Sequence, residues 1–224
     1  MDLIKEALAK GQSVLSEHDS KRFLSHCGIP VIHEALAPNA DSAAAEAVKI
    51  GFPVVLKASG ENLFHKTEAG GVVLNLRSEA EVREEGRRLL RIPGCEALLV
   101  QEMVKGDREL VCGLARDSQF GPCVMFGLGG VFTELLADVV FRVAPLTALD
   151  AQEMMKEIRG REIIEAFREE PAIDTDALAQ TLVILGRIGL QYEEVFQIDI
   201  NPLKIRSRGT PVSVDALVVL RADG

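Results

Sequence analysis

Two polar residues near the end of the chain interrupt apolar segments at a spacing that suggests a shared ligand. Asn201 and Asp215 are equally distant in sequence from Arg208, which lies in the turn-like segment RSRG. A hairpin centred on Arg208 would place the two side chains opposite each other, with Cβ atoms about 5 Å apart. Asp199 would share the face of Asn201 by strand alternation. Their oxygen atoms suit Mg²⁺, so the sequence predicts a magnesium site; the alternative is an Asx turn and an unrelated acidic residue.

A lysine and a histidine are candidates for phosphate chemistry. Lys57 ends the apolar segment PVVLK and could reach nucleotide phosphates, or it could simply protect a strand edge. The segment 59–70 that follows is longer than a hairpin requires, and it contains His65. A neutral imidazole is a good nucleophile toward phosphorus, so His65 is a candidate phosphate carrier. Most loop histidines are simply solvated, which is the alternative.

The glycine-rich segment 127–130 (GLGG) would let backbone N–H groups approach an oxyanion. It is not a GxGxxG dinucleotide motif, because Phe132 occupies the third glycine position, and the chain contains no GKS or GKT sequence of a Walker motif. Glu134 and Arg142 follow closely and could hold metal and phosphate respectively. The alternative for both is an ordinary surface charge.

The segment 101–110 (QEMVKGDREL) ends one apolar stretch and begins the next. A short connection of this kind exposes backbone groups that could bind the edge of an adenine. Glu109 could accept hydrogen bonds from ribose hydroxyls. A plain hairpin turn explains the segment equally well.

Composition limits the possible partners. The 224 residues are 47% hydrophobic and 26% charged, which predicts a folded chain with one domain or two small lobes. A net charge of −9 argues against nucleic acid. The four cysteines form no CxxC pair and are expected to be reduced, mostly buried thiols. No apolar run approaches the roughly 20 residues that cross a bilayer, and the N-terminal residues do not resemble a signal sequence, so we expect a cytoplasmic protein without a membrane partner.

The apolar patterns predict an α+β fold with largely antiparallel strands, because strands and helices do not alternate strictly. A short amphipathic helix is expected at the N-terminus, and a capping box at Ser78 and Glu81 opens a later one. The other helices are expected at 16–27, 41–50, 149–158, 161–167 and 176–190. The strands are expected at 53–58, 71–76, 97–103, 109–116, 122–126, 139–144, 195–203 and 212–220.

The order of these segments along the chain resembles the ATP-grasp superfamily. The segments that carry the resemblance are GFPVVLKASGENLFHKTEAGGV, QEMVKGDREL, FGLGGVFTELLADVVFRVAPL, QIDINPL and VDALVVL. More narrowly, residues 16–220 resemble the β subunit of ADP-forming acyl-CoA synthetases, relatives of succinyl-CoA synthetase β. The resemblance implies an ATP-grasp fold of two α/β lobes, residues 1–100 with the helical start and residues 101–224, which hold a nucleotide between them.

The resemblance also implies roles for individual residues. His65 would relay phosphate to ADP, and Arg142 would steady the moving phosphoryl group. The implied nucleotide contacts are Lys57 with the phosphates, Glu102 and Val104 with the adenine through their backbones, Glu109 with the ribose, and Gly129 and Gly130 in the glycine-rich segment. Asn201 and Asp215 would bind Mg²⁺. The less secure role of Glu134 is again metal binding.

The implied activity is that of an acid–thiol ligase, acyl-CoA + ADP + phosphate ⇌ carboxylic acid + ATP + CoA. A partner α subunit would bind CoA and carry the first phosphohistidine, so we expect a hetero-oligomer that is incomplete without that subunit. One alternative is an ATP-grasp carboxylate–amine ligase, which would not need His65. Another is a non-catalytic module that senses nucleotide.

Overall fold

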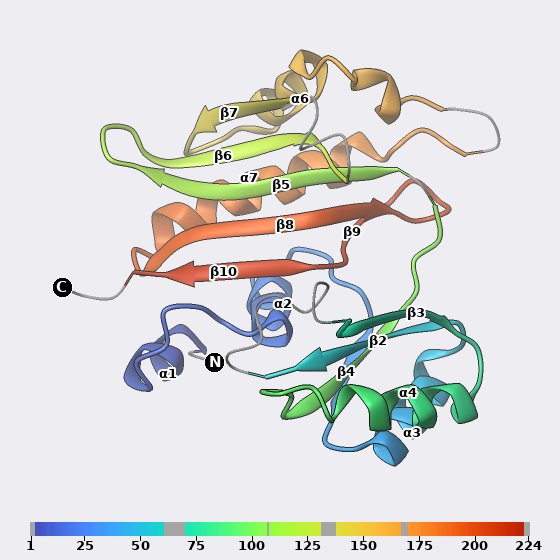
Figure 1. The fold of residues 1–224 in the computed structure, drawn as a ribbon. Helices are drawn as coiled ribbons and strands as arrows, with labels where there is room; N and C mark the ends of the chain where they lie inside the picture. The colour runs from blue at the N-terminus through green and yellow to red at the C-terminus, as the bar shows by residue number, and fades with distance from the viewer. Residues whose placement is uncertain (1–2, 61–69, 107, 131–137, 167–169, 222–224) are drawn as a thin grey trace. The chain divides into compact units, whose positions relative to one another are not determined.

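The computed structural model describes residues 3–60, 70–106, 108–130, 138–166 and 170–221 (Figure 1). The chain divides into two compact units. Unit 1 comprises Met1–Val31 and Val104–Gly224, and unit 2 comprises Ile32–Met103. Each unit has its own antiparallel sheet and its own cluster of buried apolar side chains.

Unit 2 is a four-stranded sheet with two helices packed against it. Its strand order is β1-β4-β2-β3, and all neighbouring strands are antiparallel. The strands are β1 (Glu34–Ala37), β2 (Val54–Ser59), β3 (Val72–Leu76) and β4 (Ala97–Glu102), and the helices are α3 (Ala40–Ile50) and α4 (Glu79–Leu89). Small residues allow close packing: a Cβ at Gly86 of α4 would lie only 3.1 Å from the Cβ of Ala40.

Unit 1 contains a larger antiparallel sheet with the order β10-β8-β5-β6-β7, and β9 also pairs with β8. The strands are β5 (Glu109–Asp117), β6 (Gly121–Leu128), β7 (Val139–Val143), β8 (Val195–Ile205), β9 (Pro211–Ser213) and β10 (Ala216–Leu220). The helices α6 (Ala148–Glu157) and α7 (Thr175–Gln191) and the 3-10 helix η1 (Arg161–Ile164) lie along one face of this sheet (Figure 1).

Strand alternation divides the side chains of the large sheet between its two faces. On β5, Leu110, Cys112 and Leu114 belong to the apolar core that the helices cover. On β8, Ile198 and Ile200 belong to the same core. The intervening positions of both strands therefore point away from α6 and α7, and they include the polar residues described below.

The first 31 residues belong to unit 1, whereas the sequence assigned the helical start to the N-terminal lobe. They contain α1 (Leu3–Ala9) and α2 (Glu17–His26). The connection between these helices pairs with the outer edge of β10, where Leu15 N–H donates to the Val218 carbonyl (3.0 Å) and Leu220 N–H to the Ser13 carbonyl (2.7 Å). An amphipathic helix predicts a buried face but not the sheet that buries it, so this docking was not predictable from periodicity.

Most predicted elements are present with small shifts at their ends, and four details differ. The strand β1 was missed, because its sequence EALA contains no β-branched or aromatic residue. The helix expected at 161–167 is the shorter η1. The strand expected at 212–220 is broken into β9 and β10. At α4, the Ser78 hydroxyl accepts from Glu81 N–H as predicted, but the Glu81 carboxylate accepts from Arg77 N–H (2.7 Å).

Candidate functional site

The pairs around the last hairpin confirm the predicted register. Leu203 pairs with Ser213 on one side, and Ile200 pairs with Ala216 on the other. Both pairs are centred on residue 208, so the same register places Asn201 and Asp215 opposite each other. The magnesium role of the two side chains stays a prediction.

An irregularity in the sheet coincides with this position. Between the pairs Leu110↔Leu203 and Cys112↔Ile200, β5 has one residue and β8 has two, Asn201 and Pro202. This is the pattern of a β-bulge, which re-aims side chains and is common beside active sites.

A second carboxylate, that of Asp199, lies beside the pair Asn201 and Asp215. Asp199 is half-buried on the same face as Asn201, and burial raises its pKa, with a further rise from the nearby charge of Asp215. Two carboxylates that disfavour each other's charge, together with an amide oxygen, make a donor set that fits Mg²⁺, which accepts a few oxygen ligands and keeps several waters. No cluster of three or more His, Cys, Asp or Glu side chains suited to a metal occurs in the described part of the chain.

The predicted ribose contact has a partner that the sequence did not indicate. Glu109 begins β5 and pairs with Lys204 of β8, and the Lys204 Nζ lies 3.0 Å from a Glu109 carboxylate oxygen. The same ammonium group donates to the Gly106 carbonyl (3.1 Å). Glu109 and Lys204 point to the same face as Asp199 and Asn201, so strands β5 and β8 gather four polar side chains there.

The glycine-rich segment is shaped by close backbone contacts. A Cβ at Gly127 would lie 2.3 Å from the Asp138 carbonyl oxygen, and one at Gly129 would lie 2.7 Å from that of Leu110. Gly130 has a φ of +62°, and a Cβ there would lie 2.7 Å from a carboxylate oxygen of Glu109. The fold therefore requires these glycines, and it brings Gly130 beside the predicted ribose ligand. Gly129 N–H already donates to the Glu109 carbonyl (2.8 Å).

Three predicted nucleotide contacts lie in or beside unit 2. Lys57 is buried in β2, and alternation along the strand places it on the face opposite the core residues Leu56 and Ala58. Glu102 ends β4, and its N–H donates to the His33 carbonyl (2.9 Å), so a contact with adenine would fall to its carbonyl. Val104 is the first residue of unit 1 after β4.

The structure does not bring Arg142 to the polar face. Arg142 pairs with Val124, whose side chain belongs to the helix-covered core, so the arginine points toward the helices. There its guanidinium forms an ion pair with Glu157 at the end of α6. Sequence proximity to the glycine-rich segment suggested a phosphate role, but strand alternation directs the side chain elsewhere.

His65 and Glu134, the other two predicted site residues, lie outside the described residues. Asp138 follows the segment that contains Glu134 and is buried. Its carboxylate accepts from the N–H groups of Arg159 and Gly160 (2.8 Å each). Burial acts to raise the pKa of Asp138, but these two hydrogen bonds and Arg159 hold it below its usual value. Asp138 thus fixes the start of β7 to the connection after α6, a role that no sequence motif indicated.

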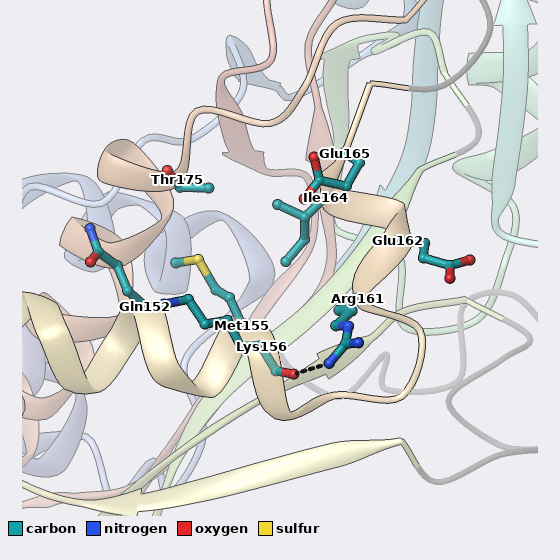
Figure 2. Close-up of a pocket in the computed structure, with 8 residues that line it drawn as sticks. All are labelled: Gln152, Met155, Lys156, Arg161, Glu162, Ile164, Glu165 and Thr175. Carbon is teal, nitrogen blue, oxygen red and sulfur yellow. Dashed lines mark hydrogen bonds between the residues drawn. The ribbon is translucent and has the colours of Figure 1, made fainter.

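Two hollows in unit 1 are lined by residues other than the four polar residues of β5 and β8. One, of about 390 Å³, is lined by α6, η1 and the start of α7, and Figure 2 shows the Arg161 guanidinium donating to the Lys156 carbonyl (3.5 Å) at its rim. It contains none of the predicted site residues. The other, of about 370 Å³, lies by the β5–β6 turn and β7, and Arg142 is among its lining residues.

The four cysteines are free thiols, as the sequence predicts. The expectation that most of them are buried is wrong, because Cys112 is buried whereas Cys27, Cys95 and Cys123 are partly exposed. Among the described residues, no helix has both the length and the apolar character to cross a membrane.

The sequence matches the model of a known domain family. The family is described as "ATP-grasp domain", and the match covers residues 6–220. The chain is 37% identical over 226 residues to subunit beta of acetate–CoA ligase (ADP-forming) I from Pyrococcus furiosus, covering 98% of this chain and 97% of that protein. It is 40% identical over 207 residues to acetate–CoA ligase (ADP-forming) II from Archaeoglobus fulgidus, of which it spans only 30%.

Solved structures of relatives are similar to this chain in both fold and sequence. The dinucleotide-forming acetyl-coenzyme A synthetase 1 of Candidatus Korarchaeum cryptofilum, in complex with coenzyme A and Ca-AMPCP, superposes with a TM-score of 0.93 and 43% identity, covering 98% of this chain and 99% of that chain. A second structure of that protein, with coenzyme A and Mg-AMPPCP, has its phosphohistidine segment pointing towards the nucleotide-binding site (TM-score 0.88, 43% identity, the same coverage).

Proposed function

This chain belongs to the ATP-grasp domain family, among the β subunits of ADP-forming acetate–CoA ligases, and from this premise we propose that it transfers phosphate between a phosphohistidine and ADP or ATP. It is the nucleotide-binding part of an acid–thiol ligase that catalyses acyl-CoA + ADP + phosphate ⇌ carboxylic acid + ATP + CoA. The observation that carries the proposal is the match along 97% of the P. furiosus protein, which is itself named as a separate beta subunit. The named relatives are CoA ligases, which supports this function over a carboxylate–amine ligase or a nucleotide sensor.

Phosphoryl transfer depends mostly on positioning and on neutralising charge. In this proposal Lys57 binds the nucleotide phosphates, and the N–H of Gly130 adds a second contact. Glu109 binds the ribose hydroxyls, held in place by Lys204 at 3.0 Å. The carbonyl of Glu102 and the backbone of Val104 bind the adenine.

Asn201 and Asp215 hold Mg²⁺ in this proposal. Magnesium held by these two side chains would offset the charge of the nucleotide phosphates. The register of the last hairpin and the β-bulge at Asn201 support the assignment, because they bring an amide and a carboxylate together on the face that also carries Glu109. The Mg-AMPPCP complex of the Korarchaeum relative is a further support.

His65 is the relay in this proposal. The bond between phosphorus and the imidazole nitrogen breaks as a bond to the terminal phosphate oxygen of ADP forms, and the imidazole takes up one proton from water, which yields ATP and neutral His65. In the reverse direction ATP phosphorylates the histidine. A second subunit binds CoA and supplies the first phosphohistidine. The structure of the relative with coenzyme A, whose phosphohistidine segment points towards the nucleotide-binding site, supports a step of this kind.

The test is substitution of His65 in the enzyme reconstituted with its CoA-binding partner. His65→Ala should abolish turnover and leave Mg-ADP affinity nearly unchanged, because the other nucleotide contacts are intact. Incubation of the wild-type chain with Mg-ATP or with the phosphorylated partner should yield an acid-labile, base-stable phosphate. Mass spectrometry at alkaline pH should locate it on His65. The matched control is His26→Ala at the exposed end of α2, which should leave both turnover and phosphate incorporation unchanged.

Two results would contradict the proposal. Normal turnover by His65→Ala would remove the relay role and favour direct transfer from the histidine of the partner to ADP. Complete conversion of carboxylate, CoA and ATP by the isolated chain would show that no CoA-binding partner is required.

A further inference from the structure

Lys21 of α2 is a fully buried lysine that no part of the proposed nucleotide site uses. Its exposed fraction is 0%, and it is among the largest side chains that are entirely enclosed. The Lys21 Nζ donates to a carboxylate oxygen of Glu17 (2.8 Å), one turn earlier on the same helix. It also donates to the Val214 carbonyl (3.0 Å), 193 residues later in the chain.

Val214 occupies the break between β9 and β10. Its N–H donates to the Pro202 carbonyl of β8 (3.1 Å), while its carbonyl accepts from Lys21. The backbone at this break is therefore held from two sides, by the neighbouring strand and by α2. The next residue is Asp215, which the hairpin register places opposite Asn201.

Burial of a lysine side chain at this position is energetically unfavourable. An ammonium group without a partner in a protein interior is strongly unfavourable, and even a buried ion pair is often no more stable than apolar residues of similar volume. Glu17 neutralises the charge, but an apolar pair would fill the same space. What an apolar pair would not provide is the hydrogen bond to Val214.

We propose that Lys21, supported by Glu17, is a positioning residue for the magnesium site. By fixing the Val214 carbonyl, it sets the direction in which the next residue presents its carboxylate to Asn201 and Asp199. Lys21 acts through the backbone and does not itself contact the metal or the nucleotide. The inference rests on the proposed metal role of Asn201 and Asp215.

The choice of cation distinguishes positioning from general stability. Mg²⁺ requires near-octahedral geometry with short ligand distances, whereas Ca²⁺ accepts longer and more variable ones. A displaced Asp215 carboxylate should therefore weaken Mg-ADP binding more than Ca-ADP binding. A loss of stability alone would reduce the fraction of folded protein and would leave the ratio of the two affinities unchanged.

The main test is the double variant Glu17→Leu/Lys21→Met, which removes the buried charges together and keeps most of the apolar volume. Calorimetry on the full chain should show Mg-ADP affinity lower by about tenfold or more, the loss of roughly one hydrogen bond to a charged group. Ca-ADP affinity should fall by less than about threefold, because Ca²⁺ tolerates a displaced carboxylate better than Mg²⁺ does. In an Asp215→Ala background the same double variant should cause no further loss, because the carboxylate that it positions is absent.

Ser20→Ala is the matched control. Ser20 is also fully buried on α2, and its hydroxyl accepts from Val218 N–H (3.1 Å), three residues beyond Asp215. The control should lower thermal stability and leave the ratio of Mg-ADP to Ca-ADP affinity unchanged.

The outcomes separate this inference from the proposed function. If Asp215→Ala weakens Mg-ADP binding but the double variant keeps the wild-type ratio of affinities, the positioning role is wrong and the metal assignment stands. If Asp215→Ala leaves Mg-ADP affinity unchanged, the metal assignment itself is wrong. Should the double variant fail to fold, Lys21→Arg retains the charge partner of Glu17, but its larger guanidinium cannot take the same place. The same shift toward Ca²⁺ is then expected, and an unchanged ratio would overturn the inference.

Discussion

The two faces of the large sheet in unit 1 carry different kinds of side chain, although the same strands supply both. Toward α6 and α7, strands β5 and β6 present the buried apolar residues of the core, such as Leu114 and Phe126. Away from the helices, β5 and β8 present Glu109, Asp199, Asn201 and Lys204. Because side chains alternate along a strand, folding energy and candidate chemistry can be assigned to separate sets of residues in one sheet.

Cys112 and Asp199 show how closely the two sets adjoin. Cys112 pairs with Ile200, the immediate neighbour of Asp199, and lies on the helix-covered face. Burial raises the pKa of the Cys112 thiol far above its usual value, and the charge of Asp199 adds to the rise. The thiol therefore stays protonated and belongs to the core, although a charged residue of the other face is its near neighbour.

The largest expected effect comes from the helix-covered face. Phe126 is fully buried, and Phe126→Ala should lower the free energy of unfolding by about 3–5 kcal/mol, the range for deleting a buried aromatic ring. Urea unfolding measures this loss. The protein that remains folded should bind Mg-ADP with wild-type affinity. A loss of affinity as large as that of a polar-face variant would contradict the assignment of stability and nucleotide binding to separate faces.

A variant of the polar face should change a free energy by less than Phe126→Ala does, but the change should appear in Mg-ADP binding and not in unfolding. Asp215→Ala should weaken Mg-ADP binding by roughly 30–150-fold, which corresponds to about 2–3 kcal/mol for removing one partner of a charged group. The stability of the nucleotide-free protein should hardly change, because removal of this charge relieves its unfavourable effect on Asp199. Calorimetry and thermal unfolding measure the two quantities. The control is Asp41→Ala, which removes an exposed carboxylate that pairs with Arg83 in unit 2 and should leave affinity unchanged.

The smallest effect is expected for Arg142→Gln. This variant also decides between the phosphate role that the sequence suggested for Arg142 and the structural role that the ion pair with Glu157 indicates. The ion pair with Glu157 is partly exposed, so its loss should cost less than about 1 kcal/mol. Because Arg142 points toward the helices, turnover of the reconstituted enzyme should stay within about twofold of wild type, a difference of less than 0.5 kcal/mol in the barrier. Glu157→Gln should behave in the same way. A hundredfold loss of kcat for Arg142→Gln alone would restore the catalytic role that the sequence suggested.

The features that the sequence predicted well are local ones. The register of the last hairpin follows from counting residues on either side of Arg208, and alternation then places Asp199 on the face of Asn201. The pairing of Glu109 with Lys204 was not predictable, because it depends on how β5 and β8 align across a bulge. The bond from Lys21 to Val214 was not predictable either, since it joins residues 193 positions apart.

The resemblance to a family predicted the fold, which local patterns did not, but it predicted the orientation of side chains less well. It implied an ATP-grasp fold, which the domain match and the superposed structures confirm. It also suggested a phosphate role for Arg142 from its place in FRVAPL. A motif fixes the position of a residue along a strand, whereas the face to which the side chain points depends on the pairing of neighbouring strands.

The covering of β10 by residues 13–31 has a consequence for synthesis. Hydrogen bonds join this segment to partners up to 207 residues later (Ser13 to Leu220), so unit 1 cannot finish folding until the strands of the last hairpin have left the ribosome. Unit 2 is one continuous stretch, Ile32–Met103, with contacts that form within itself. Long-range pairing is slow because the intervening chain must first be ordered. We therefore expect unit 2 to fold while the chain is still being made. The helices α1 and α2 should remain undocked until β10 has been synthesised.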